Sequence, residues 1–206
     1  MRGGRSAALL EMTAADLFRR VVALLDGAGI PYMLTGSFAS SYHGVPRATQ
    51  DIDFVIAPTR DQLRRLVARL PAAEYYVDEA AALDALDHES QFNVIDLTTG
   101  WKVDFMCRRS RPFSRTEFDR RTRAELHGLG LFIATAEDVV LAKLEWAKRG
   151  GSQRQVEDVA GLLRVRGDDL DLVYVTRWVD ELGVNAEWLA AQRAANRDAE
   201  PGRPDR

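Results

Sequence analysis

The sequence predicts an α+β fold, in which a mixed β-sheet flanked by helices is followed by a small C-terminal helical lobe. Strand-like runs rich in β-branched and aromatic residues recur up to residue 134 and alternate with helical stretches. From Thr135 to Arg193 the apolar residues recur with a helical period instead. We therefore expect a core over residues 1–134, a helical lobe packed on it over 135–195, and a flexible polar tail over 196–206.

The composition is that of an ordinary globular protein, with 46% hydrophobic and 29% charged residues in 206. No apolar run approaches the roughly 18 residues of a membrane-spanning helix, and the start lacks a signal peptide, so we expect no membrane association. The single cysteine, Cys107, excludes an internal disulfide and fits a cytoplasmic location. We expect Cys107 to be a core residue.

The first elements are predicted by their caps and breakers. Thr13 is the expected N-cap of an amphipathic helix that runs to Leu25. Pro31 favours extended backbone, so a short strand is expected over 32–34. The pair Gly36-Ser37 breaks this strand and opens a short helix.

The later elements follow from alternation and turn signals. Residues 51–56 predict a strand and residues 60–70 a second amphipathic helix. Further expected elements of the core are a short strand and a helix over 74–87, strands over 92–97 and 101–106 joined by a glycine turn, and short strands over 124–126 and 131–134. The lobe is expected to hold three or four helices, broken at Gly150-Gly151, Gly167 and Gly183.

Two carboxylates stand in the strand DIDFVI. Since side chains alternate along a strand, Asp51 and Asp53 share one face about 6 to 7 Å apart, and the apolar residues take the other. Asp104 of WKVDFM would join them if its strand lay beside the first. Three oxygen ligands without a nearby cysteine or histidine predict a Mg²⁺ or Mn²⁺ site. A lone Asp-x-Asp would be weak support, because such pairs are common at strand ends.

The Gly36-Ser37 turn offers the complement of a metal site. Glycine lets the backbone approach a ligand, and Ser37 adds a hydroxyl at a helix N-terminus, where N–H groups attract anions. Arg47, four residues before Asp51, could also reach a phosphate. A polyphosphate is therefore the expected ligand of this segment.

A basic segment follows Asp104. Residues 108–123 hold seven arginines against two acidic residues, although the whole chain carries a formal charge of −3. A solvated helix face is the simplest interpretation, and an RNA or triphosphate contact is the alternative. The residues proposed for RNA contact are Arg108, Arg109, Arg111, Arg115, Arg120 and Arg121.

These motifs together resemble the nucleotidyltransferase superfamily (DNA polymerase β-like). Its signature is a hydrophobic strand, Gly-Gly or Gly-Ser, a spacer, Asp-x-Asp or Asp-x-Glu, and a third acid. More narrowly, GS…PRATQDIDFVI and TAEDVVLAKLEWAKRGGSQRQVEDVAGLL resemble the AbiEii/MenT-like toxin nucleotidyltransferases, over about Tyr32 to Leu163. The resemblance implies that Lys143 and Asp158, on consecutive helices, are part of the active site.

The residues themselves leave a second account of this lysine and aspartate open. Lys143 lies on a partly apolar flank of its helix, and Asp158 lies off the core line of the next one. An interhelical ion pair explains both residues without any function. With the resemblance, we expect Lys143 to bind phosphates and Asp158 to orient Lys143 or the nucleotide.

The predicted function is a metal-dependent transfer of a nucleoside monophosphate from an NTP to an acceptor, with release of pyrophosphate. Asp51, Asp53 and Asp104 would hold the ions, and Asp104 would help to activate the acceptor hydroxyl. The resemblance suggests the 3′ end of tRNA as acceptor and a toxin role with a cognate antitoxin. Protein adenylylation, nucleotidylation of a small molecule such as an aminoglycoside, and a non-catalytic nucleotide-binding module are the alternatives. The histidines His43, His88 and His127 show no metal spacing and are expected to be structural or solvated.

Overall fold

The structure is a computed structural model that describes residues 4–197, and the expected tail lies outside them from residue 198 onward. The chain divides into two compact units. The first unit comprises Gln50–Ile133 and the chain up to Leu34, and the second unit comprises Thr35–Thr49 and the chain from Ala134 onward. Residues 35–49, which the sequence analysis counted with the sheet, therefore group with the C-terminal helices.

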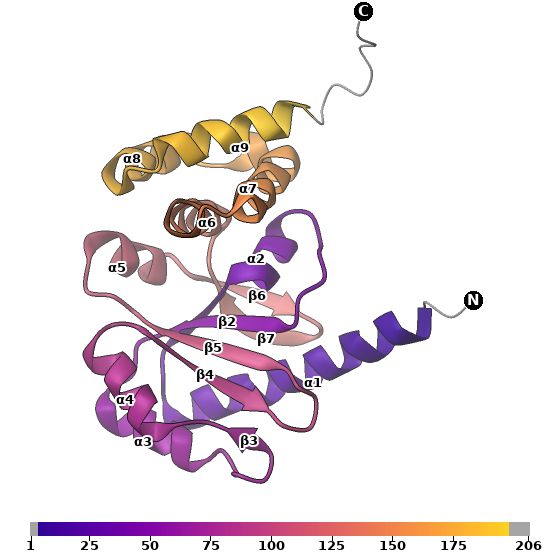
Figure 1. The fold of residues 1–206 in the computed structure, drawn as a ribbon, viewed down its shortest axis with the longest axis vertical. Helices are drawn as coiled ribbons and strands as arrows, with labels where there is room; N and C mark the ends of the chain where they lie inside the picture. The colour runs from indigo at the N-terminus through magenta and orange to yellow at the C-terminus, as the bar shows by residue number, and fades with distance from the viewer. Residues whose placement is uncertain (1–3, 198–206) are drawn as a thin grey trace, which may run out of the picture. The chain divides into compact units, whose positions relative to one another are not determined.

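Within residues 4–197, seven strands form one sheet in the order β3-β4-β5-β2-β1-β7-β6 (Figure 1). The sheet is mixed: β2 runs parallel to β5 and β1 parallel to β7, whereas β4 runs antiparallel to β5. The predicted α+β fold is confirmed. The strands are β1 (Tyr32–Thr35), β2 (Asp51–Ile56), β3 (Tyr75–Tyr76), β4 (Gln91–Asp96), β5 (Lys102–Cys107), β6 (Thr122–Leu126) and β7 (Leu129–Ile133).

An aromatic core covers one face of this sheet. Phe18 packs edge-on against Phe54, with ring centroids 6.3 Å apart, and Phe54 stacks on Phe105 at 6.1 Å. Since Phe54 and Phe105 alternate with the acidic residues of their strands, the acids lie on the opposite face. Figure 1 shows α3 and α4 side by side next to β3 and β4. The helices of the first unit are α1 (Gly4–Ala28), α3 (Arg60–Ala68), α4 (Glu79–Asp87) and α5 (Pro112–Asp119).

The predicted start of the first helix is wrong. Helix α1 begins at Gly4, so Thr13 lies within it instead of capping it. Residues 5–12 contain neither glycine nor proline and are mostly good helix formers, so nothing stops the helix at Thr13. The helix also runs past the expected end at Leu25 as far as Ala28, and Gly29, which follows it, has a left-handed φ of 69°.

The turn between β4 and β5 is built around a buried carboxylate. Asp96, at the end of β4, accepts hydrogen bonds from the backbone N–H groups of Thr98 (2.9 Å) and Thr99 (3.0 Å). Arg20 of α1 forms an ion pair with it at 2.8 Å. These contacts satisfy a charge that would be costly to bury alone. Both strands lie within one residue of their predicted bounds.

The second unit is helical, and its breaks fall at the predicted glycines. Gly151 and Gly183 adopt the left-handed conformation that ends α6 and α8. Among the helices of residues 4–197, none has the length and apolar character that a bilayer crossing requires. The elements are α2 (Gly36–His43), α6 (Ala136–Gly150), α7 (Gln153–Arg166), a 3₁₀ turn (Gly167–Asp169), α8 (Leu172–Leu182) and α9 (Asn185–Arg197).

Candidate active site

The three predicted acids lie on one face of two neighbouring strands. Parallel pairing of β2 with β5 makes Asp53 and Asp104 direct Cα partners, with Asp51 opposite Lys102. Residues paired in register point to the same side of a sheet, so Asp51, Asp53 and Asp104 share a face. The sequence left open whether the two strands are neighbours, and the structure pairs them over their whole length. We call these three residues the acidic cluster.

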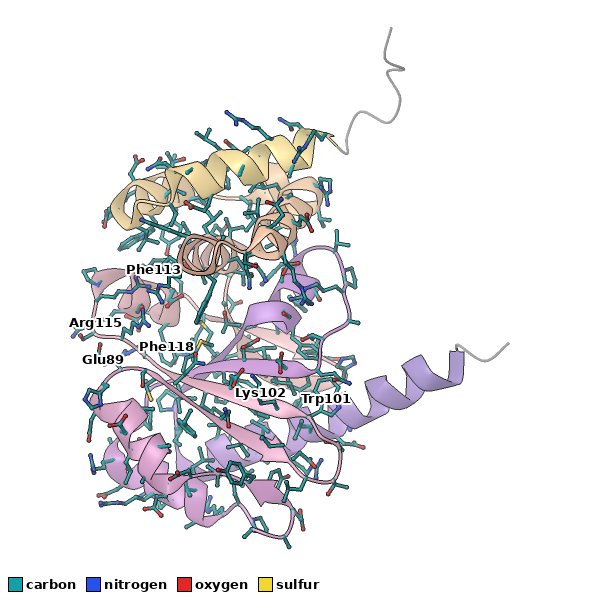
Figure 2. The ribbon with its side chains drawn as sticks, in the orientation of Figure 1. Glu89, Trp101, Lys102, Phe113, Arg115 and Phe118 are labelled. Atoms are coloured by element: carbon teal, nitrogen blue, oxygen red, sulfur yellow. The ribbon has the colours of Figure 1, made fainter. Side chains whose placement is uncertain are left out.

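Lys102 lies among the acids, and the sequence analysis missed it. Its Nζ is 2.8 Å from Asp104 Oδ2 and 3.6 Å from Asp51 Oδ1. The signal was present in the sequence, because Lys102 precedes Asp104 by two residues and must share its face. Its hydrogen bond to Asp104, with the charges of Asp51 and Asp53, raises the pKa of Lys102 above its usual value despite partial burial. Lys102 is labelled on β5 in Figure 2.

The donor chemistry of the acidic cluster suits a hard divalent cation, since all three ligands are carboxylates. The geometry is not that of a ready metal site, because no three His, Cys, Asp or Glu side chains within residues 4–197 are gathered closely enough to hold an ion. The ammonium of Lys102 instead bonds Asp104, whose side chain is 13% exposed. The residues therefore fit Mg²⁺ or Mn²⁺ in kind, and they would have to release Lys102 to bind either.

A fifth polar residue, Asn93, lies beside the acidic cluster and Lys102. Asn93 of β4 is the antiparallel partner of Asp104, so it points to the same face. Its side chain is exposed. An amide beside the carboxylates offers a further oxygen ligand or a donor to a nucleotide.

The predicted pair Lys143–Asp158 exists in the second unit. Lys143 Nζ of α6 donates to Asp158 Oδ2 of α7 at 2.6 Å and to Gln155 Oε1 at 3.1 Å. The side chains are only 4% and 11% exposed. An interhelical ion pair explains both residues fully, so a role of the pair in ligand binding needs further support.

Arg47 supplies part of that support. Its Nε donates to Asp158 Oδ2 at 3.2 Å and its Nη2 donates to the hydroxyl of Ser37. Asp158 thus holds two cations, and Arg47, whose side chain is 23% exposed, is the more accessible of the two. We call Ser37, Arg47, Lys143 and Asp158 the basic cluster. Four of the residues predicted for phosphate binding or catalysis therefore meet in the second unit.

Two glycines allow this approach. A Cβ on Gly44 would lie 3.1 Å from the Leu162 side chain and 3.2 Å from its Cα, and one on Gly161 would lie 3.3 Å from Val45. Such distances are tighter than packed side chains normally adopt. The segment after α2 can therefore lie against α7, which brings Arg47 within reach of Asp158. The sequence analysis did not single out either glycine.

The start of α2 has the features expected of an anion site. Gly36 has φ 64°, a conformation that strongly favours glycine. The N-cap, Thr35, makes no side-chain hydrogen bond to the first turn in the described structure. The first N–H groups of a helix carry partial positive charge, and Ser37 lies among them.

Most arginines of the basic segment pack on aromatic rings. The guanidinium of Arg121 lies 4.2 Å from the Phe118 ring centroid and 5.2 Å from that of Phe132. Arg108 lies over Phe118 at 5.5 Å and Arg111 over Phe113 at 5.4 Å. Arg115 on α5 is exposed (Figure 2), whereas Arg109 and Arg120 are half-buried. The segment is therefore not a freely solvated face.

The histidines are structural or solvated and the cysteine is a core residue, as expected. His43 is buried, its Nε2 lies 2.7 Å from the Ala134 carbonyl oxygen, and desolvation lowers its pKa. His88 is exposed beside Asp84, and His127 adopts a positive φ of 53° in the β6–β7 turn. Cys107 is buried, which raises its pKa to about 11 and disfavours the reactive thiolate.

The fold is similar to that of several solved structures. The crystal structure of an antigenic nucleotidyltransferase-like protein from Paracoccidioides brasiliensis matches with a TM-score of 0.51 at 16% identity, over 90% of this chain and 92% of that one. The antibiotic-resistance factor ANT(2'')-Ia in solution gives a TM-score of 0.47 at 14% identity, over 92% and 95%. The Thermotoga maritima CCA-adding enzyme with tRNA gives 0.39 at 13% identity, over 84% and 51%.

At these identities the likeness concerns the fold, which is nucleotidyltransferase-like. No protein-family model and no curated protein sequence matches the chain.

Proposed function

We propose that the protein is a metal-dependent nucleotidyltransferase that moves a nucleoside monophosphate from an NTP to an acceptor. The observation that carries this proposal is the registered pair Asp53–Asp104 with Asp51 on the same face of the sheet. Their carboxylate oxygens are the kind of ligand that Mg²⁺ and Mn²⁺ prefer. The nucleotidyltransferase-like fold supports the same chemistry.

The acidic cluster would bind Mg²⁺ or Mn²⁺. Such ions stabilise charge on the transferred and leaving phosphates. Asp104 would accept the proton of the acceptor hydroxyl, whose oxygen attacks the α-phosphorus. The bond from this phosphorus to the bridging oxygen breaks, and pyrophosphate leaves with the electron pair. Asp51 and Asp53 would orient the triphosphate through the ions they hold.

The basic cluster would bind phosphate oxygens. Arg47 offers a planar guanidinium, and Ser37 offers a hydroxyl beside the N–H groups that open α2. Asp158 bonds both Arg47 and Lys143, so it can fix both cations in position. Lys143 would add a second positive charge toward the triphosphate.

For the acceptor, we propose RNA, with the 3′ end of tRNA as the first candidate, and a toxin role paired with an antitoxin. The exposed Arg115 and the half-buried Arg109 and Arg120 support an RNA contact, because their segment follows directly on the strand of Asp104. A protein hydroxyl or a small molecule such as an aminoglycoside is the second candidate, since neither would need the basic segment.

The test is a transfer assay with each α-³²P-labelled NTP and Mg²⁺, offered total tRNA, cell protein or aminoglycosides. We expect label on tRNA with the wild type and a loss of at least 100-fold with Asp53→Asn, which keeps the shape of the side chain and removes a ligand charge. The matched control is Asp61→Asn, an exposed carboxylate on α3.

Label on protein or on an aminoglycoside would mean that RNA is not the acceptor, and the proposed nucleotidyl transfer would still stand. If the protein binds nucleotide and transfers it to no acceptor, it is a nucleotide-binding module and the proposed enzyme activity is wrong.

A further inference from the structure

Lys102 occupies the position at which the acidic cluster would meet a cation. It is the register partner of Asp51, and its ammonium bonds Asp104 at 2.8 Å while it lies 3.6 Å from Asp51. An arrangement of three carboxylates and one ammonium is far better balanced than three carboxylates alone. The lysine therefore contributes to the stability of the strand pair in the metal-free protein.

We propose that Lys102 is a built-in counter-ion of the acidic cluster, which a divalent cation must displace before it can bind. This inference rests on the proposed function, because it requires that the acids form a cation site. In this proposal Lys102 sets the affinity of the acidic cluster for the metal ion and takes no part in the transfer reaction.

The geometry makes such displacement feasible. The Lys102 side chain is 39% exposed, and its ammonium is carried on a flexible four-carbon stem. The stem can stay on the sheet while the charged end turns away toward water.

Displacement has a consequence for the order of binding. A free metal ion must compete with an ammonium already bonded to Asp104, so it binds weakly alone. An ion that arrives with a triphosphate brings anionic oxygens that can accept the released ammonium. The protein would then bind the metal–nucleotide complex in preference to the free ion.

The experiment is a Mn²⁺ titration without nucleotide, followed by electron paramagnetic resonance of the free ion. The proteins are the wild type, Lys102→Met, Lys102→Arg and the control Lys148→Met, which removes an exposed lysine of α6. We expect Lys102→Met to bind Mn²⁺ about tenfold more tightly or better, because the competing charge is gone. Lys102→Arg should bind as weakly as the wild type, and Lys148→Met should not change the affinity.

Equal Mn²⁺ affinity in Lys102→Met and the wild type, with measurable binding in both, would overturn the inference and leave the proposed function standing. No binding to any variant, Lys102→Met included, at millimolar Mn²⁺ would also overturn the inference, and the transfer assay with NTP and Mg²⁺ would then decide on the proposed function. A thermal melt in EDTA gives an independent measurement: Lys102→Met should melt below the wild type and regain the difference when Mn²⁺ is added. Unchanged melting in EDTA would also contradict the counter-ion role.

Discussion

Asp158 is the residue on which the basic cluster depends. It bonds Lys143 at 2.6 Å and Arg47 at 3.2 Å, and its side chain is nearly buried. One carboxylate thus balances two cations at low exposure, where charges interact more strongly than in water. Neutralising Asp158 would leave two neighbouring positive charges that repel each other.

The first prediction is that Asp158→Asn lowers the free energy of unfolding more than Lys143→Met does. We expect about 3 kcal/mol or more for Asp158→Asn and about 1–2 kcal/mol for Lys143→Met, since Asp158 retains Arg47 in the latter. Urea denaturation measures both, with Arg154→Met, which removes an exposed cation of α7, as the control. Equal losses would mean that the Arg47–Asp158 contact contributes little.

At the scale of elements, α5 separates two kinds of arginine. Arg121, just after the helix, packs its guanidinium on Phe118 and Phe132 and donates to the Phe118 carbonyl at 2.5 Å. Arg115, in the middle of the helix, is exposed. Reversing the charge of Arg121 should therefore lower the stability of the fold, whereas reversing the charge of Arg115 should weaken ligand binding.

The second prediction follows from this division. Arg115→Glu should weaken transfer to RNA, reduce the slope of log K against log salt by about 1, and leave NTP binding unchanged. The matched control is Arg64→Glu, an exposed arginine of α3. If RNA transfer is unaffected by Arg115→Glu, the basic segment loses its proposed role at this position.

Arg121→Glu is expected to act through the fold instead. A carboxylate against two aromatic rings loses the cation–π contacts and is poorly solvated, so we expect a loss of about 2 kcal/mol in the free energy of unfolding. Thermal melting compares Arg121→Glu with Arg115→Glu. A stable Arg121→Glu protein would contradict the packing role of this side chain.

At the scale of the whole molecule, the acidic cluster belongs to the first unit and the basic cluster to the second. Each unit has its own core: the aromatic residues behind β2 and β5 in one, and the apolar faces of α6, α7 and α9 in the other. We expect each cluster to contribute to ligand binding from its own unit. Ligand-induced stabilisation tests this directly.

The fourth prediction concerns the melting temperature. A non-transferable NTP analogue with Mg²⁺, at about 100 times its dissociation constant, should stabilise the protein by about 2.7 kcal/mol, or roughly 5 to 11 °C for a chain of this size. The increase should shrink in EDTA and in Asp53→Asn. An Asp53→Asn protein that shows the full increase with Mg²⁺ would mean that the acidic cluster does not contribute to nucleotide binding.

Much of the fold could be predicted because its signals are local. The alternation in residues 51–56 and 102–107 fixes which side chains share a face, and the glycines at 151 and 183 end helices by their left-handed backbone. The start of α1 was missed because Thr13 resembles a cap, while the residues before it are equally able to continue a helix.

The candidate site was predicted in its parts and not in its connections. The period of a strand placed Asp51 and Asp53 together, but nothing in the sequence identified β5 as the neighbour of β2. Arg47 was expected to contact phosphate, whereas its bonds to Ser37 and Asp158 depend on packing of the chain after α2 against α7. The Arg47–Asp158 contact joins residues 111 positions apart, and local patterns do not specify it.

The sequence by itself determined the donor chemistry: three carboxylates on strands, a glycine-serine turn, and a lysine and an aspartate on consecutive helices. Only the tertiary structure decided the positive partner of the acids. The pairing of β2 with β5 sets Lys102 opposite Asp51 and beside Asp104, so an ammonium of the chain itself balances the carboxylates. The physical reason is that side-chain alternation is a property of one strand, whereas charge balance across a sheet depends on which strands lie side by side.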